Sequence, residues 1–244
     1  MIDYNAYVGK WPFYSIPYDS AKKLSELYEQ HGISGGYVSS VESIFYNDFY
    51  ESELMLYREL KNTKFYHVVT PNPAFVECPV TLERCIKDFD VKGIRIHPEF
   101  HGFSLTDACL KPVIEIARKY KLPLFVTARM HDGRISHILH PRTISTDELR
   151  AFILENTDLK IILCHFHQNE IEAIQKQLFE YPGVFTDTTG LRGNLFGEAN
   201  TEIYKKAVFG SGYPLIPVAS CVYTLSELSG EAREVFHSRE DVLL

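Results

Sequence analysis

Eight short runs rich in branched and aromatic residues alternate with amphipathic segments along the whole chain. The runs cover residues 2–9, 36–39, 65–70, 91–98, 122–127, 159–164, 184–187 and 208–210. Strands that alternate with helices pair in parallel, so the pattern predicts an α/β protein and fits a single (β/α)8 TIM barrel. A doubly wound sheet gives a similar count and stays an alternative. No shift in composition marks a linker, so we expect one domain over residues 1–244.

The intervening segments predict helices, because their apolar residues recur three and four positions apart. The main expected helices cover residues 20–30, 81–89, 110–120, 170–181, 203–207 and 218–228. Another begins near Asn47, which is a candidate N-cap. Ser145 and Glu148 form a capping box at the start of a further helix.

Composition argues against several classes of function. The 244 residues include 25 basic and 32 acidic side chains, giving a net charge of −7, and no run of Lys or Arg. We therefore expect no nucleic-acid partner. No apolar run reaches membrane length and the N-terminus lacks a signal-peptide pattern, so we expect a cytoplasmic protein with no membrane partner. The five cysteines are scattered, which indicates buried thiols rather than disulfides. A homodimer is expected on general frequency alone.

Polar residues follow the expected strands at their carboxyl ends, where (β/α)8 barrels carry their working residues. Seven of the ten histidines fall between positions 97 and 167. The candidate catalytic and substrate-binding residues at these ends are Asn5, Tyr7, Arg95, His97, His101, Arg129, Asp132, Arg134, His137, His165, His167 and Asp187. Any single histidine among them can instead cap a helix or hold a loop.

Four of the strand ends carry short motifs that can be compared with a known family. GIRIHP stands at residues 93–98, LKIILCH at 159–165, VFTDTTG at 184–190 and FGSGYP at 209–214. In this order and spacing they resemble the amidohydrolase-related (amidohydrolase 2) metal-dependent hydrolases, and the resemblance covers almost the whole chain. It implies a TIM barrel with its active site at the carboxyl ends of the strands.

The resemblance also implies a divalent metal, which lowers the pKa of a bound water. In the family this metal is held by two first-strand histidines, a fifth-strand histidine and an eighth-strand aspartate. The corresponding residues here are Asn5, Tyr7, Thr127 and Gly212. Asn and Tyr are poor zinc ligands and Gly has no side chain, so no metal or other cofactor is predicted at these positions. His165 is kept, and the resemblance implies that it acts on the substrate as an acid, a base or an oxyanion donor.

Relocated ligands are the alternative. A zinc or manganese ion would then be held by loop histidines and a carboxylate, chosen from His97, His101, His165, His167, Glu99 and Asp187.

Three further motifs resemble a less-studied branch of the same family. They are DYNAYVGKWPF at residues 3–13, HGFSL at 101–105 and RMHDGRISH at 129–137. In the last motif, two guanidinium groups accompany a carboxylate and a histidine. Such a set suits an anionic or carbonyl-bearing ligand, with Asp132 holding one arginine in place. The alternative is an Arg–Asp pair that only stiffens the loop.

Two functions are compatible with these residues. The first is a hydrolase-like enzyme that acts on a small ester, lactone or amide, with catalytic residues His165, His97, Arg129 and Asp132. A decarboxylase or an isomerase is allowed by the same barrel. The second is a non-catalytic barrel that binds or senses a small ligand, and the loss of the metal positions motivates it. In both, the expected partner is a small molecule that the sequence does not name.

Overall fold

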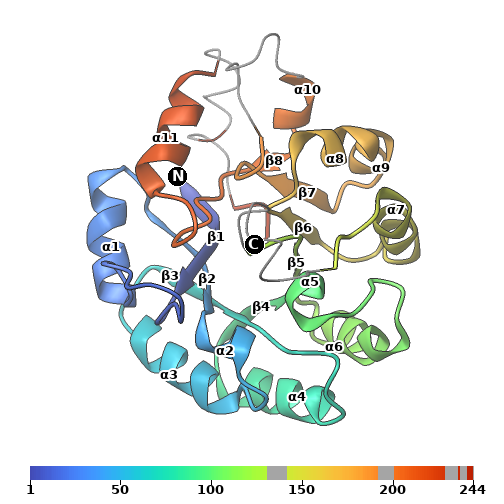
Figure 1. Cartoon of the computed structure of the whole chain (residues 1–244), viewed down its shortest axis with the longest axis horizontal. Coiled ribbons are helices and arrows are strands. Elements are labelled where there is room, and N and C mark those ends of the chain that lie inside the picture. The colour runs from blue at the N-terminus through green and yellow to red at the C-terminus, as the bar shows by residue number, and fades with distance from the viewer. Residues whose placement is uncertain (131–141, 192–200, 229–235, 237–240, 244) are drawn as a thin grey trace.

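Eight parallel strands form one sheet, and each strand pairs with the next strand along the chain (Figure 1). This computed structural model describes residues 1–130, 142–191, 201–228, 236 and 241–243. The strands are β1 (Ile2–Val8), β2 (Gly35–Ser40), β3 (Phe65–Val69), β4 (Val91–Ile96), β5 (Leu124–Thr127), β6 (Ile161–Cys164), β7 (Val184–Asp187) and β8 (Ala207–Val208). The predicted (β/α)8 barrel is confirmed, and the doubly wound alternative is wrong because its strand order would not follow the chain.

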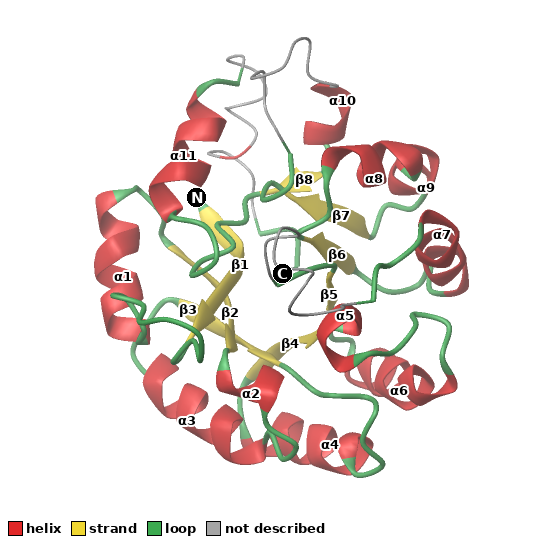
Figure 2. Cartoon of the chain, in the orientation of Figure 1, coloured by secondary structure: helices red, strands yellow, loops and turns green. Residues whose placement is uncertain are grey.

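Helices surround the strands as an outer layer (Figure 2). They are α1 (Ala21–Gln30), α2 (Glu42–Phe45), α3 (Tyr50–Leu60), α4 (Cys78–Asp88), α5 (Pro98–His101), α6 (Lys111–Tyr120), α7 (Thr146–Glu155), α8 (Gln168–Ala173), α9 (Gln175–Glu180), α10 (Thr201–Tyr204) and α11 (Val218–Ser226). None of these helices is both long and apolar enough to cross a membrane.

The helices differ from the sequence prediction in several details. The helix expected over residues 203–207 ends at Tyr204, and Ala207 belongs to β8 instead. The helix expected over residues 170–181 is divided at Ile174 into α8 and α9. The single-turn helices α2 and α5 were not predicted, because one turn is too short to show a period. Asn47 does not cap α3, whose first amide is bonded by the side chain of Asp48.

The barrel closes between β8 and β1 through backbone bonds and one buried carboxylate. The amide of Tyr4 donates to the carbonyl of Phe209 at 2.8 Å, and the amide of Gly212 donates to the carbonyl of Asn5 at 2.7 Å. Asp3 is fully buried, and its carboxylate accepts from the amide of Ser211 at 3.0 Å. The first strand is therefore fixed to the last.

Large side chains fill the barrel interior near the amino ends of the strands. Tyr4, Tyr37 and Phe125 form a buried cluster there. The hydroxyls of Tyr4 and Tyr37 each donate to the carboxylate of Asp241 at 2.9 Å. The tail of the chain thus packs against this end of the barrel, and the carboxyl ends of the strands remain for a functional site.

A buried acid–imidazole pair joins α3 to β3. Glu53 and His67 are almost inaccessible, and a Glu53 oxygen lies 2.6 Å from Nε2 of His67. The other Glu53 oxygen accepts from the amide of Thr70 at 2.9 Å. One carboxylate therefore pairs two groups that would otherwise be buried without a partner.

Glu53→Leu should destabilise the fold by about 3 kcal/mol, because it leaves both the Thr70 amide and the His67 ring unpaired inside the protein. The unfolding midpoint in urea, followed by circular dichroism, measures the loss. Lys87→Gln removes an exposed ion pair with Glu83 and should leave that midpoint unchanged. Equal midpoints for Glu53→Leu and the wild-type protein would contradict the assigned role of the buried pair.

Candidate active site at the carboxyl ends of the strands

Asn5 connects two buried charges inside the barrel mouth. The guanidinium of Arg95 donates to Oδ1 of Asn5, and its Nη2 donates to the carbonyl of Tyr4 at 3.1 Å. Nδ2 of Asn5 donates to Oδ2 of Asp187 at 2.6 Å. Asn5, Arg95 and Asp187 are all 0% exposed. Since a guanidinium only donates and a carboxylate only accepts, these two partners fix the orientation of the amide.

Asp187 carries the negative charge of this network. Its Oδ1 accepts from Oγ1 of Thr189 at 2.6 Å and from the amide of His165 at 3.2 Å. Burial raises the pKa of Asp187 to about 6, against the opposing effect of these hydrogen bonds. The carboxyl is therefore mainly ionised at pH 7. It offsets only part of the charge of Arg95, which still acts as a positive charge on His97 and His165.

His165 follows β6 in a left-handed backbone conformation, with φ of +58°. Few residues other than Gly adopt this conformation, and it costs energy unless neighbours enforce it. The amide of His165 is bonded to Asp187 and, at 3.2 Å, to Oγ1 of Thr189. Its carbonyl accepts from Nη1 of Arg129 at 2.6 Å. The backbone is thus held from both sides.

The ring of His165 occupies space that a side chain at position 212 would need. A Cβ atom built on Gly212 would lie 2.8 Å from Nε2 of His165, closer than such contacts normally occur. Gly212 also has a φ of +62°, which favours glycine. The glycine at the eighth-strand position and the placement of His165 are therefore linked.

Arg129 is paired with Glu170 of α8. Nη2 of Arg129 donates to Oε1 of Glu170 at 2.6 Å, and Nη1 donates to Oε2 at 2.9 Å. Glu170 also accepts from the amide of His167 at 2.6 Å. The sequence interpretation gave the anchoring role to Asp132 and missed Glu170, although Glu170 stands three residues after His167, where a capping-box acid is expected. Asp132, Arg134 and His137 lie outside the described residues.

His97 and His101 lie on the β4 side of the mouth, next to Tyr7. The ring of His97 is 5.9 Å from that of Tyr7 and 5.8 Å from that of His101, between centroids. The hydroxyl of Tyr7 is 3.3 Å from Oγ1 of Thr127. Within the described ranges, four ring nitrogens have no hydrogen-bond partner. They are Nδ1 and Nε2 of His97, Nδ1 of His101 and Nε2 of His165. Buried polar atoms rarely lack partners, so these nitrogens mark a place where a ligand or water can bind.

All three imidazoles are neutral at physiological pH. Burial lowers the pKa of His165 to about 3, and the positive charges of Arg95 and Arg129 act in the same direction. Burial, His101 and Arg95 hold the pKa of His97 well below its usual value. Burial lowers the pKa of His101 to about 4. The mouth therefore combines neutral rings with a positive field.

Glu99 and His167 complete the polar rim. The carboxylate of Glu99 accepts from the amide of Met130 at 3.2 Å, and burial raises its pKa to about 7. His167 stands at the N-cap of α8. The sequence interpretation treated Glu99 only as a possible metal ligand, because the burial that raises its pKa depends on contacts distant in sequence.

The residues at three of the four expected metal positions, Asn5, Tyr7 and Gly212, do not fit a divalent cation. Both ends of the Asn5 amide are engaged, one of them by the cationic group of Arg95. Burial raises the pKa of Tyr7, so its hydroxyl stays protonated. Gly212 offers no ligand atom, and the His165 ring fills its side-chain space. Across the described residues, no group of three or more His, Cys, Asp and Glu side chains is arranged to hold a metal.

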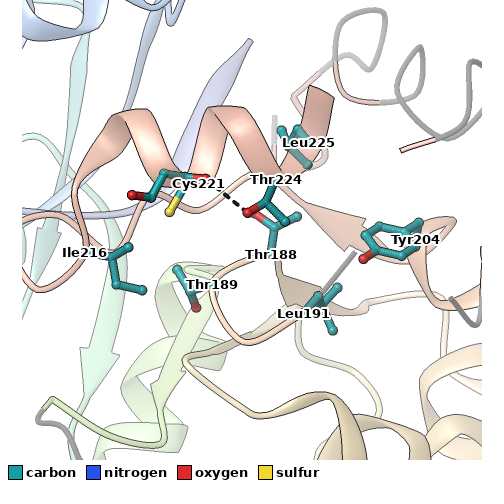
Figure 3. Close-up of a pocket in the computed structure, with 9 residues that line it drawn as sticks. Thr188, Thr189, Leu191, Tyr204, Ile216, Cys221, Thr224 and Leu225 are labelled. Carbon is teal, nitrogen blue, oxygen red and sulfur yellow. Dashed lines mark hydrogen bonds between the residues drawn. The ribbon is translucent and has the colours of Figure 1, made fainter. Parts of the chain in front are cut away.

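A separate small cavity lies between the end of β7 and α11 (Figure 3). Its volume is about 90 Å³, and its lining residues are Thr188, Thr189, Leu191, Tyr204, Ile216, Ser220, Cys221, Thr224 and Leu225. Thr189 belongs both to this lining and to the bonds around Asp187. None of the three imidazoles lines the cavity, so it is not the centre of the candidate site.

Solved structures of low sequence identity share the fold. A putative amidohydrolase from Staphylococcus aureus has a TM-score of 0.69 at 12% identity, covering 96% of this chain and 95% of that one. A manganese-bound 5-carboxyvanillate decarboxylase from Novosphingobium aromaticivorans has a TM-score of 0.67 at 13% identity, covering 96% and 93%. A 2,6-dihydroxybenzoate decarboxylase, in complex with 2,6-dihydroxybenzoate, has a TM-score of 0.63 at 14% identity, covering 96% and 95%.

The sequence itself is matched by a family model. Among curated proteins, none matches the chain. The model described as amidohydrolase matches residues 60–227, which is 168 of the 244 residues. With the strand-end motifs and the eight-stranded barrel, this match shows that the chain belongs to the amidohydrolase family.

Proposed function

We propose that the carboxyl end of this barrel binds a small carbonyl- or carboxylate-bearing compound and acts on it through His165 and His97, without a divalent metal. The observation that carries the proposal is the set of buried imidazole nitrogens without partners among the described residues, on rings where the charge of Arg95 is felt at His97 and His165. Perturbed histidines that converge at a barrel mouth are a usual sign of a functional site.

The positive field of Arg95 supports this assignment. The same charge lowers the pKa of His97 and of His165, because it disfavours a second positive charge nearby. By the same electrostatics, it stabilises negative charge that a ligand brings or develops there. Arg95 is fully buried, so it acts on the ligand through its field rather than by contact.

Neutral imidazoles suit a carbonyl substrate. A neutral ring has one N–H donor and one acceptor nitrogen, so it can donate to a carbonyl oxygen without losing a proton. As negative charge develops on that oxygen, the hydrogen bond strengthens. It then lowers the free energy of the bound transition state relative to that of the bound substrate. An anionic ligand would also raise the pKa of His165 and so make the ring a better proton acceptor.

Arg129 acts as a positioning residue in this proposal. Its guanidinium is bonded to Glu170 and to the carbonyl of His165. These bonds hold the strained backbone that aims the His165 ring. The catalytic role of Asp132 and the ligand-binding roles of Arg134 and His137 stay predictions from the sequence.

Names of similar structures are compatible with a carboxylate substrate. Two of them are decarboxylases of hydroxylated aromatic acids by their titles. At identities of 13–14%, they support the fold and leave hydrolysis and decarboxylation as competing reactions on this barrel.

A non-catalytic ligand-binding barrel is the second candidate. The changed residues Asn5, Tyr7, Thr127 and Gly212 favour it, because the family's metal-activated water cannot be produced by them. A ligand that raises the melting temperature and is recovered unchanged would support this second function.

His165→Gln should lower turnover by about 100-fold or more, because the ring that donates to the developing oxyanion is lost. Turnover is measured on a panel of small esters, lactones and hydroxylated aromatic acids, by chromatography of the products. His31→Gln is the matched control, since His31 stands at the C-cap of α1 and should not affect turnover. Unchanged turnover of any accepted substrate in His165→Gln would reject the assignment.

Stability should fall as the pH drops below about 6.5, and His165 should carry part of this loss. The unfolded ring takes up a proton near pH 6.5, whereas the folded ring does so only near pH 3. Between these values the unfolded state binds more protons, so acid favours unfolding, by up to about 1.4 kcal/mol per pH unit for one group. Urea midpoints for the wild-type protein and for His165→Gln, measured from about pH 7 to pH 4.5, should show a shallower decline in the variant. Parallel declines would contradict a neutral buried His165.

A further inference from the structure

His101 is held in one tautomer by a contact with α2. Its Nε2 lies 2.9 Å from the carbonyl oxygen of Ile44. A carbonyl oxygen only accepts hydrogen bonds, so Nε2 must carry the proton and donate. Because burial lowers the pKa of His101 to about 4, Nδ1 is not protonated as well at neutral pH. Nδ1 is therefore a lone-pair acceptor.

This acceptor nitrogen is buried and has no partner among the residues that the structure describes. The centroid of its ring is 6.4 Å from that of Phe103 and 5.8 Å from that of His97, whose plane is inclined by 74°. The acceptor thus belongs to the same histidine cluster as the proposed carbonyl-binding rings. A lone pair repels a carboxylate or a carbonyl oxygen and requires a donor.

We propose that Nδ1 of His101 accepts a hydrogen bond from a hydroxyl or N–H group of the ligand. The substrate class is then a hydroxy- or amino-substituted carbonyl or carboxylate compound, in which the donor lies close to the carbonyl group. This inference rests on the proposed function, which places the carbonyl oxygen at His97 and His165. A site built around a fixed acceptor rejects analogues that lack the donor, because the buried nitrogen is left unpaired.

Matched probe pairs separate the donor from the rest of the ligand. The pairs are glycolate and methoxyacetate, lactate and 2-methoxypropionate, and 2-hydroxybenzoate and 2-methoxybenzoate. Each methoxy probe keeps the carboxylate and the oxygen but cannot donate. Binding to the full chain is followed by the ¹⁵N resonances of labelled histidine, which report protonation and hydrogen bonding at each ring nitrogen.

Two substitutions at position 101 separate the Nε2 donor, which bonds the Ile44 carbonyl, from the Nδ1 acceptor, which is proposed to bond the ligand. His101→Gln places an amide nitrogen near the Nε2 position, so it keeps a donor for the Ile44 carbonyl and loses the Nδ1 acceptor. His101→Asn places an amide oxygen near the Nδ1 position and keeps an acceptor for the ligand. Melting temperatures of both variants verify that they fold.

The expected result is a preference of roughly tenfold for at least one hydroxylated probe over its methoxy partner, with the Nδ1 resonance of His101 shifted on binding. His101→Gln should lose the preference and His101→Asn should retain it. Equal binding within every pair, or an unchanged preference in His101→Gln, would overturn the inference while the proposed function stands. If no probe perturbs His97, His101 or His165, both the proposed function and this inference are rejected.

Discussion

The amide of Asn5, placed between a buried guanidinium and a buried carboxylate, is the interaction on which the site depends. It connects Arg95 on β4 to Asp187 on β7 through β1, so three strands of the barrel share one polar network. Two opposite charges buried without such links would carry a large desolvation cost. Asp187 extends the network to the backbone of His165, and Arg129 holds that backbone from the other side. The position of the catalytic candidate thus follows from the fully buried charge of Asp187 and the partly buried charge of Arg129.

The same network occupies the first-strand position at which the family is expected to carry a metal-ligating histidine. A histidine at position 5 would have to replace both hydrogen bonds of the Asn5 amide, while the buried charges of Arg95 and Asp187 would remain. The barrel mouth therefore has a positive field that belongs to the chain itself. In our proposal, the neutral rings of His97, His101 and His165 form hydrogen bonds with a carbonyl or carboxylate compound. The positive field stabilises the negative charge of that compound.

The fold could be predicted from the sequence to a large extent, because each strand and most helices are encoded by local patterns. Ser145 caps α7 as expected, and its hydroxyl accepts from the amide of Glu148. The carboxylate of Glu148 turns instead to Arg142 and to the amide of Leu105, and the latter contact, 43 residues away, cannot be read from a local pattern. The division of the expected helix at Ile174 could not be predicted locally either, because the apolar spacing continues across it. The sequence predicted which residues of the site follow the strands. It did not predict which of these side chains are bonded to one another. The bond between Arg129 and Glu170 spans 41 residues, and the tautomer of His101 depends on a carbonyl 57 residues away.

We propose that the guanidinium of Arg95, rather than a bound metal ion, supplies the positive charge at the barrel mouth. The most direct test of this proposal is the metal content of the full chain, purified without chelators or a histidine tag and assayed by mass spectrometry before and after incubation with zinc or manganese. We predict far less than one tightly held ion per chain in both states, because the residues at the expected ligand positions are engaged with Arg95, Asp187, Thr127 and His165. A stoichiometric ion that survives dialysis would contradict the account and would show that other side chains hold a metal.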